Sequence, residues 1–534
     1  MSLTPLSSKL GLATYQGPWT KQTATHLLNR TLFGAKQAEI DAFFTKGLSQ
    51  SVTELLNPTT PIPPPPVNEY NTATVTDAAV PVGTTWVNNP TGDGTINSLR
   101  RNSFKKWLAG IMIHQAPSIR EKLTLFWANH FGTEADTISN ANYVYQHHDT
   151  LRKNALGNFK TMVKAITIDP GMLRYLNGYL NTASAPDENY GRELQELFTV
   201  GKDNAVQFSE ADVKAAARVL TGWRINSSYT SYFDPTRHDT GIKQFSSYYN
   251  NKVITGKAGQ AGATETDELI QMLFEKADTA KYICRRLYRW FVYYYIDDTV
   301  EKNIIEPLAI IFKENNFEII PVLNALLNSE HFYDPIYFGC QIKSPIDHVI
   351  GTLRKANVVF PDAATDYVDA YAHFNNMVGQ LTNLGQNLAD PPNVAGWPAY
   401  YQSPEFYELW INADTLPKRN KFTDLMVDTG YTRNGRRVII DGIALAKTIS
   451  SKPADPNQLI QDLFALFIST EIDQTIKDNL KKQILLSGQT SDYYWTDAWN
   501  SYQSIQNTIN FNLVNNRLKT LLKYIMNLPD YQLS

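Results

Sequence analysis

The side chains best suited to chemistry gather within residues 127–201, where acidic, basic and imidazole groups are dense. Glu193 and Glu196 stand three residues apart in a predicted helix, directly after Arg192. Asn189, Glu193 and Glu196 would share one stripe of that helix, because offsets of three and four residues stack side chains. The stripe borders apolar positions, and carboxylates buried there must be paired, protonated or bound to a cation.

Three interpretations of this cluster are open. In the first it is a structural ion-pair network, since Arg192 lies four residues from both Glu188 and Glu196. In the second it is a hydrolytic site, with Glu193 and Glu196 as acid and base and with His130 and Arg192 assisting them. In the third, His130, Glu193 and Glu196 hold a divalent metal ion, although the spacing matches no established zinc motif.

Several other classes of site lack their sequence signatures. The chain has no G-x-S-x-G nucleophile elbow, no Walker A loop and no G-x-G-x-x-G that opens a helix after a strand. The two cysteines, Cys284 and Cys340, are too few for a disulfide framework and lack the spacing of a zinc site. Of the possible cofactors, only a divalent metal follows from the residues, and whether the protein is an enzyme stays open.

Composition also bounds partners and location. The 534 residues carry 49 Lys and Arg against 52 Asp and Glu, a balance that argues against bulk nucleic-acid binding. No apolar run approaches the ~20 residues of a transmembrane helix. Residues 1–10 lack a basic stretch followed by an apolar one, so the cytoplasm is the default, with export through an additional leader as the alternative.

The elements that must position the cluster are predicted to be helices, because apolar residues recur at helical spacing over most of the chain. We therefore expect a mainly α fold: a large multi-helix globular assembly with long Pro/Gly-rich loops and at most small β-hairpins. Asn-Gly within Arg433–Arg436 favours one such hairpin turn. The predicted helices around the cluster are Ser103–Gln115, Ser118–Asn129, Tyr143–Thr150, Asn158–Ile168, Asn189–Val200 and Glu210–Leu220.

Changes in composition suggest four segments that pack as one structural unit. Residues 1–56 are N-terminal helices, and residues 57–98 form a Pro-rich arm around Pro61–Val67. Residues 99–260 are the central helical core that carries the polar cluster. Residues 261–534 form a C-terminal helical part packed on that core.

Several motifs together resemble the bacterial domain-of-unknown-function-1800 family. They occur in this order from about residue 20 to the C-terminus: HLLNRTLFG at 26–34, FWANHF at 126–131, LRKNALGNF at 151–159, DENYGRELQELFTVG at 187–201, ARVLTGW at 217–223, His238-Asp239, and DPPNVAGWP at 390–398. The resemblance implies a mostly helical fold and supplies no established activity. It also implies frequent export and a partner protein similar to phosphatases and sulfatases.

The resemblance favours one spatial cluster built from Asn129, His130, Arg192, Glu193, Glu196, His238 and Asp239. We also expect the helices of residues 100–223 to form the centre of the fold, with the 390–398 loop packed near them. Around the catalytic candidates we expect substrate-binding roles for Asn129, Arg152, Asn189, His238, Asp239 and Trp397. The functional hypothesis is a hydrolase acting on a glycan or other polymer through the carboxylate/His cluster, with metal assistance in one version. The alternative is a non-catalytic scaffold or binding module whose polar cluster is a structural salt-bridge network.

Overall fold

The computed structural model describes residues 11–202, 208–402, 406–505 and 507–534. Residues 1–10, on which the prediction of a cytoplasmic location was based, lie outside the described residues. The prediction of a mainly α fold is confirmed. Among the described residues, none of the helices is long and apolar enough to cross a bilayer. The first half contains α1 (Lys21–Thr31), α2 (Gln37–Lys46), α3 (Leu48–Leu56), α4 (Gly94–His114), α5 (Arg120–His130), α6 (Ala135–Ile138), α7 (Ala141–Asn154), α8 (Phe159–Thr167), α9 (Pro170–Tyr175), α10 (Glu188–Glu193), α11 (Glu210–Val219) and α12 (Glu265–Glu275).

The second half is helical as well, and three segments of the described chain are π-helices. The remaining α-helices are α13 (Ala277–Phe291), α14 (Asp298–Val300), α15 (Glu306–Glu314), α16 (Ile319–Leu327), α17 (Pro345–Lys355), α18 (Tyr367–Asn383), α19 (Pro398–Tyr401), α20 (Thr415–Asp428), α21 (Gly442–Ile449), α22 (Pro456–Phe467), α23 (Gln474–Leu480), α24 (Tyr493–Ser504) and α25 (Thr508–Asn527). The π-helices are η2 (Leu194–Thr199), η6 (Glu301–Ile305) and η9 (Lys481–Leu485).

The strands form small antiparallel hairpins, as predicted. They are β1 (Trp223–Ile225) with β2 (Ser231–Phe233), β3 (Lys243–Gln244) with β4 (Val253–Ile254), and β5 (Tyr431–Arg433) with β6 (Arg436–Val438). The predicted turn joins β5 to β6, and its Asn434 and Gly435 have φ angles of 48° and 76°. Asn and Gly tolerate this left-handed conformation better than other residues do, which is why the dipeptide marked the turn.

Amphipathic faces explain why the helices pack as they do. In α8 the side chains of Phe159, Met162, Val163 and Ile166 are all fully buried. Their spacing of three and four residues puts them on one face, which enters the main hydrophobic core. That core extends along the chain from Leu27 to Tyr531.

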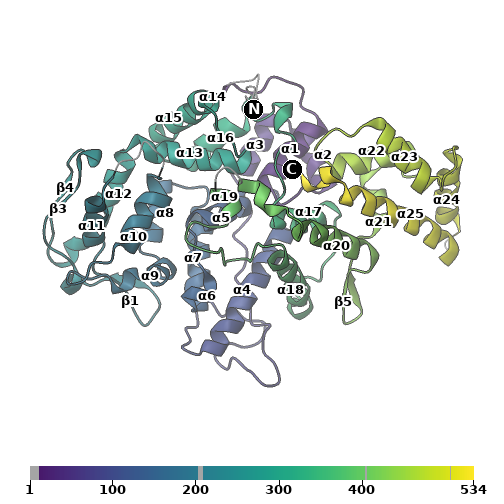
Figure 1. Cartoon of the computed structure of the whole chain (residues 1–534). Coiled ribbons are helices and arrows are strands. Elements are labelled where there is room, and N and C mark those ends of the chain that lie inside the picture. Colours follow the sequence, from purple (N-terminus) through teal and green to yellow (C-terminus); the bar gives the residue numbers. More distant parts are fainter. Residues whose placement is uncertain (1–10, 203–207, 403–405, 506) are drawn as a thin grey trace.

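The helices spread into two wings on either side of a central region (Figure 1). Helices α1–α3, α16 and α17 occupy the centre, α8–α15 with β1–β4 form one wing, and α20–α25 form the other. Helices α4, α6, α7 and α18 extend away from the centre between the wings, and α18 packs along α4. Ser534 returns to the centre, where its backbone N–H donates to the carbonyl of Gln341 (2.8 Å).

Helix α4 begins at Gly94, nine residues before the predicted start at Ser103. The reason is the cap: the carboxylate of Asp93 accepts hydrogen bonds from the backbone N–H groups of Thr95 (2.7 Å) and Ile96 (3.0 Å). These bonds satisfy amides that have no partner within the first turn. The prediction missed this start because residues 94–102 are polar and show little apolar periodicity.

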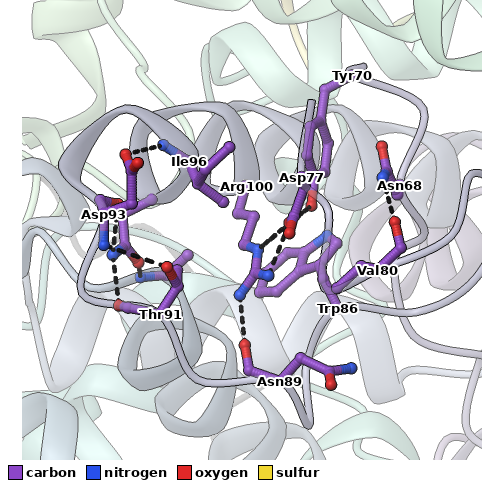
Figure 2. Close-up of polar contacts among 12 residues, drawn as sticks. Asn68, Tyr70, Asp77, Val80, Trp86, Asn89, Thr91, Asp93, Ile96 and Arg100 are labelled. Atoms are coloured by element: carbon purple, nitrogen blue, oxygen red, sulfur yellow. Dashed lines mark hydrogen bonds and ion pairs between the residues drawn. The ribbon is translucent and has the colours of Figure 1, made fainter. Parts of the chain in front are cut away.

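The Pro-rich arm is fastened to α4 by a buried ion pair (Figure 2). Arg100 is fully buried and donates from Nε (2.9 Å) and Nη2 (2.7 Å) to one carboxylate oxygen of Asp77. The Tyr70 hydroxyl donates to the same oxygen (2.7 Å), and Arg100 also donates to the carbonyl of Asn89. Residues 57–93 are therefore packed chain with few regular elements, held in place by polar contacts as well as by apolar ones.

Candidate functional site

The predicted carboxylate stripe is divided by a change of helix type. Helix α10 ends at Glu193, and the chain continues as the π-helix η2, in which the N–H of Val200 donates to the carbonyl of Gln195 (3.1 Å). A π-helix has more residues per turn than an α-helix, so the predicted three-residue stacking of Glu193 on Glu196 does not carry over. Asn189 is exposed in the first turn, where its N–H donates to the capping carboxylate of Asp187 (2.8 Å).

Close packing of α10 on α11 holds this segment. A Cβ atom on Gly191 would lie 3.1 Å from the backbone nitrogen of Ala217 and 3.3 Å from the carbonyl oxygen of Val213. The fully buried Gln195 donates from Nε2 to the carbonyl of Gly191 (2.9 Å) and accepts from the Tyr249 hydroxyl (2.8 Å). Gln195 was not predicted as a site residue, and only its place inside the motif at 187–201 pointed to it.

Arg192 is the centre of an ion-pair network, as the first interpretation predicted. It contacts Glu188 (3.4 Å) and Glu196 (3.5 Å) and makes its shortest pair with Glu210 (2.6 Å). The hydrogen bonds to Glu210 raise the pKa of Arg192, and they lower the pKa of Glu210. Glu196 also pairs with Lys202 (2.6 Å), so each of its carboxylate oxygens contacts a cation.

Glu193 differs from its neighbour in having neither an ion pair nor a hydrogen bond to any residue that the structure describes. Burial, and then the charge of Glu196, raise the pKa of the half-buried Glu193 carboxyl. Glu193 lies near Tyr175, whose hydroxyl donates to Glu134 (2.9 Å), and the charge of Asp390 also reaches this tyrosine. Glu193 is thus a carboxyl whose pKa is raised by its surroundings and whose charge no cation in the described chain contacts directly.

His130 is buried among aromatic rings, 1% exposed. Its Nε2 lies 3.0 Å from the carbonyl oxygen of Phe198. A carbonyl only accepts, so Nε2 carries the proton, and the lone pair of a neutral ring then sits on Nδ1, which has no partner in the described chain. Burial, and then the charge of Arg286, hold the pKa of His130 well below its usual range, so the imidazole is neutral.

The three candidate metal ligands are engaged separately. His130 bonds to a carbonyl and Glu196 pairs with two cations, whereas Glu193 makes neither a hydrogen bond nor an ion pair with any described residue. Within residues 11–202, 208–402, 406–505 and 507–534, no group of three His, Cys, Asp or Glu side chains is arranged to hold a metal ion. The arrangement therefore lends no support to the metal interpretation.

Asn129 anchors the 390–398 loop on the end of α5. Its Oδ1 accepts a hydrogen bond from the backbone N–H of the buried Trp397 (2.9 Å). Gly396 lies directly against Asn129 with a φ of +92°, and a Cβ on Gly132 would approach the carbonyl oxygen of Val394 to 2.7 Å. The expectation that this loop packs against the central helices is thus confirmed, and the contact occupies the amide oxygen predicted to bind substrate.

Arg152 forms a buried pair with Glu121. Its Nε and Nη2 donate to both carboxylate oxygens at 3.0–3.2 Å, and its guanidinium lies 5.0 Å from the centre of the Trp107 ring. The arginine is 2% exposed, so the contacts that the structure shows for it are internal to the protein. Glu121 lines a groove of about 780 Å³ between the Pro-rich arm, α4 and α18.

His238 and Asp239 belong to another network. The imidazole Nε2 of His238 lies 3.0 Å from the buried carboxylate of Glu265, which pairs with the buried Lys243 (2.5 Å). Burial alone would raise the pKa of Asp239, but hydrogen bonds from Arg218 and from the backbone lower it. The predicted single cluster is therefore distributed over separate networks, and the sequence offered no signal for Glu265 or Lys243.

The fold and these networks define a large, mainly helical protein in which most of the predicted polar residues are engaged within the chain. The chain belongs to the DUF1800 family: the family described as "Protein of unknown function (DUF1800)" matches residues 26–533, nearly the whole chain. Comparisons with curated proteins and with solved structures give no match.

Proposed function

We propose that this protein is a non-catalytic binding protein that holds a glycan chain in the groove between the Pro-rich arm, α4 and α18. The observation that carries the proposal is the groove itself, with its volume of about 780 Å³. It reaches the surface, because its lining includes the exposed His114 and Asp362. In this proposal the carboxylates around Arg192 are a structural salt-bridge network.

The chemistry of the lining suits a sugar. Trp107, Tyr367 and Tyr371 line the groove, and the half-buried Tyr367 is the ring against which the apolar C–H face of a pyranose can pack. The exposed His114 and Asp362 add hydrogen-bonding groups, and apolar walls with a few polar groups are the combination that orients a ligand. A groove that opens to solvent suits a polymer better than a closed cavity does, because the rest of the polymer can stay outside the protein.

The state of the carboxylates favours binding over hydrolysis. A hydrolytic pair needs one protonated and one ionised carboxyl that face the same bond. Glu193 has the raised pKa of an acid, but both carboxylate oxygens of Glu196 are engaged in ion pairs, one with Arg192 and one with Lys202, so neither is free to attack a bound sugar. Neither glutamate lines the groove, so a glycan bound there would meet Glu121, which is already paired with Arg152.

Retention on immobilised polysaccharides tests the proposal. The half-buried Tyr367 lines the groove, and we expect Tyr367→Ala to abolish retention. Tyr524 is 51% exposed on α25 and does not line the groove, so Tyr524→Ala is the matched control and should bind like the wild type. Equal retention of both variants, or no retention of the wild type on any polysaccharide, would contradict the groove as the site.

Reducing-end release by the wild type, measured in parallel, decides between binding and hydrolysis. We expect none. Release of sugar that Glu193→Gln abolishes would replace this proposal with the hydrolase hypothesis.

A further inference from the structure

A second cavity, of about 50 Å³, lies at the centre of the molecule and is unusually rich in cations. Arg30 of α1, Lys122 of α5, and Arg286 and Arg289 of α13 line it. Asp347 is the acidic side chain among its described lining residues and is paired with Lys122, and Ser534 with its terminal carboxylate lines the cavity as well, so the four cations face two acidic groups. The lining therefore carries an excess of positive charge.

Two of these arginines have no acidic partner in the described chain. Arg30 is 3% exposed, and its Nη2 donates to the carbonyl of Tyr337 (2.9 Å) and to the sulfur of Cys340 (3.1 Å). Arg286 is half-buried and donates from Nη1 to the hydroxyl of Tyr282 (3.1 Å). Neutral acceptors leave the charge of a guanidinium uncompensated, which is costly away from water.

Unused hydrogen-bond donors belong to the same cavity. Arg30 Nε and the indole N–H groups of Trp290 and Trp410 are buried, and none has an acceptor in the part of the chain described. Trp290 and Trp410 are 9% and 5% exposed. Buried donors are nearly always satisfied in folded proteins, so these three are available to an acceptor that enters the cavity.

We propose that this cavity binds a tetrahedral oxyanion, a phosphate or sulfate group. Such a group offers several acceptor oxygens, and planar guanidinium groups bind it through paired hydrogen bonds. The cavity has room for the oxyanion and little else, so a larger ligand would insert only its charged end. Arg286 and Arg289 are half-buried and give the anion a path from solvent. The site is distinct from the groove and does not depend on it.

Titration of the full-length protein with inorganic phosphate and with sulfate, each against chloride at equal ionic strength, tests the site. We expect saturable heat in calorimetry and a rise in the melting temperature with both oxyanions. Arg286→Gln should weaken binding about tenfold or more, since it removes a charged donor. The control is Arg285→Gln, the same change one residue earlier on α13, where the side chain pairs with Glu301 (2.6 Å).

Each outcome decides the proposal. Equal affinity of Arg286→Gln and the wild type, or absence of saturable binding of both oxyanions to the wild type, overturns it. Should Arg286→Gln fail to show the circular dichroism of the folded protein, Arg289→Gln takes its place with the same expected loss. The glycan experiments measure a different surface, so failure of one proposal leaves the other intact.

Discussion

Substitution of Asp77 by alanine tests whether the Pro-rich arm, and with it the wall of the groove, depends on one buried ion pair. Arg100 is fully buried and Asp77 is 4% exposed, and two of the arginine's donors converge on one carboxylate oxygen. Removing the carboxylate leaves a buried guanidinium whose remaining acceptors are the Tyr70 hydroxyl and the carbonyl of Asn89. Breaking a buried pair in this way costs about 3–5 kcal/mol.

The matched control is the neighbouring pair on the same helix. Arg101 contacts Asp136 at 3.3 Å, but that carboxylate is 68% exposed. Solvent screens such a pair, so Asp136→Ala should cost at most about 1 kcal/mol. Both variants remove an aspartate that pairs with an arginine of α4. The difference between their losses of stability therefore measures the effect of burial on such a pair.

Hydrogen exchange of the arm's amides is the assay, because it reports local opening in a chain too large for simple two-state unfolding. A loss of about 3 kcal/mol corresponds to an increase in exchange rate of roughly a hundredfold across residues 57–93. Asp136→Ala should leave these rates within a few-fold of the wild type. Protection of the arm in Asp77→Ala equal to that in the wild type would refute the reasoning.

A double variant separates the cost of an unpaired charge from the value of the pair. Replacing both members with apolar residues, as Asp77→Leu with Arg100→Met, leaves no buried charge. We expect this variant to recover most of the protection that Asp77→Ala loses. Continued rapid exchange would instead mean that the arm needs the specific geometry of the hydrogen bonds.

Three further predictions concern other parts of the chain. Because the pKa of Glu193 is raised in the folded state, ionisation of Glu193 destabilises the fold as pH rises. At pH 7 the melting temperature of Glu193→Gln should therefore be higher than that of the wild type, and the difference should vanish below about pH 4.5. A difference in melting temperature that stays the same across this range would contradict the raised pKa. Gly191→Ala should lower the free energy of unfolding, measured with denaturant, by about 1–3 kcal/mol, because the new Cβ meets the backbone of Ala217. Gly379 on α18 has open space around it, so Gly379→Ala should raise the free energy of unfolding by roughly 0.5–1 kcal/mol. Burial raises the pKa of the Cys284 thiol, so a thiol reagent should label it only after unfolding; labelling of the native protein at the rate of a free thiol would refute its burial.

Local features were predictable because their causes lie within a few residues. The capping box at the start of α11 is present, with Asp212 accepting from the N–H of Ser209 at 2.7 Å, and the hairpin at Asn434-Gly435 forms. Helix boundaries were harder, because apolar periodicity alone does not mark a break. Helices α24 and α25 are separate because Asn507 caps a new helix by accepting from the N–H of Asn510 (2.8 Å).

In the candidate site, too, contacts between neighbouring residues were predictable and contacts between distant elements were not. Pairs of Arg192 with Glu188 and Glu196 followed from four-residue spacing, but its shortest pair, with Glu210, required α10 and α11 to pack together. The neutral state of His130 depends on rings from distant helices and could not be read from its neighbours in the chain.

By itself, the sequence determined the helical class, most helix positions, the hairpin and the family, because periodicity, caps and turns act over short distances. The tertiary structure alone decided which partner each polar side chain has, which carboxyl takes up a proton and where cavities open. Charge interactions and desolvation depend on distance and burial in space, and residues such as His238 and Glu265 meet only after the chain between them has folded.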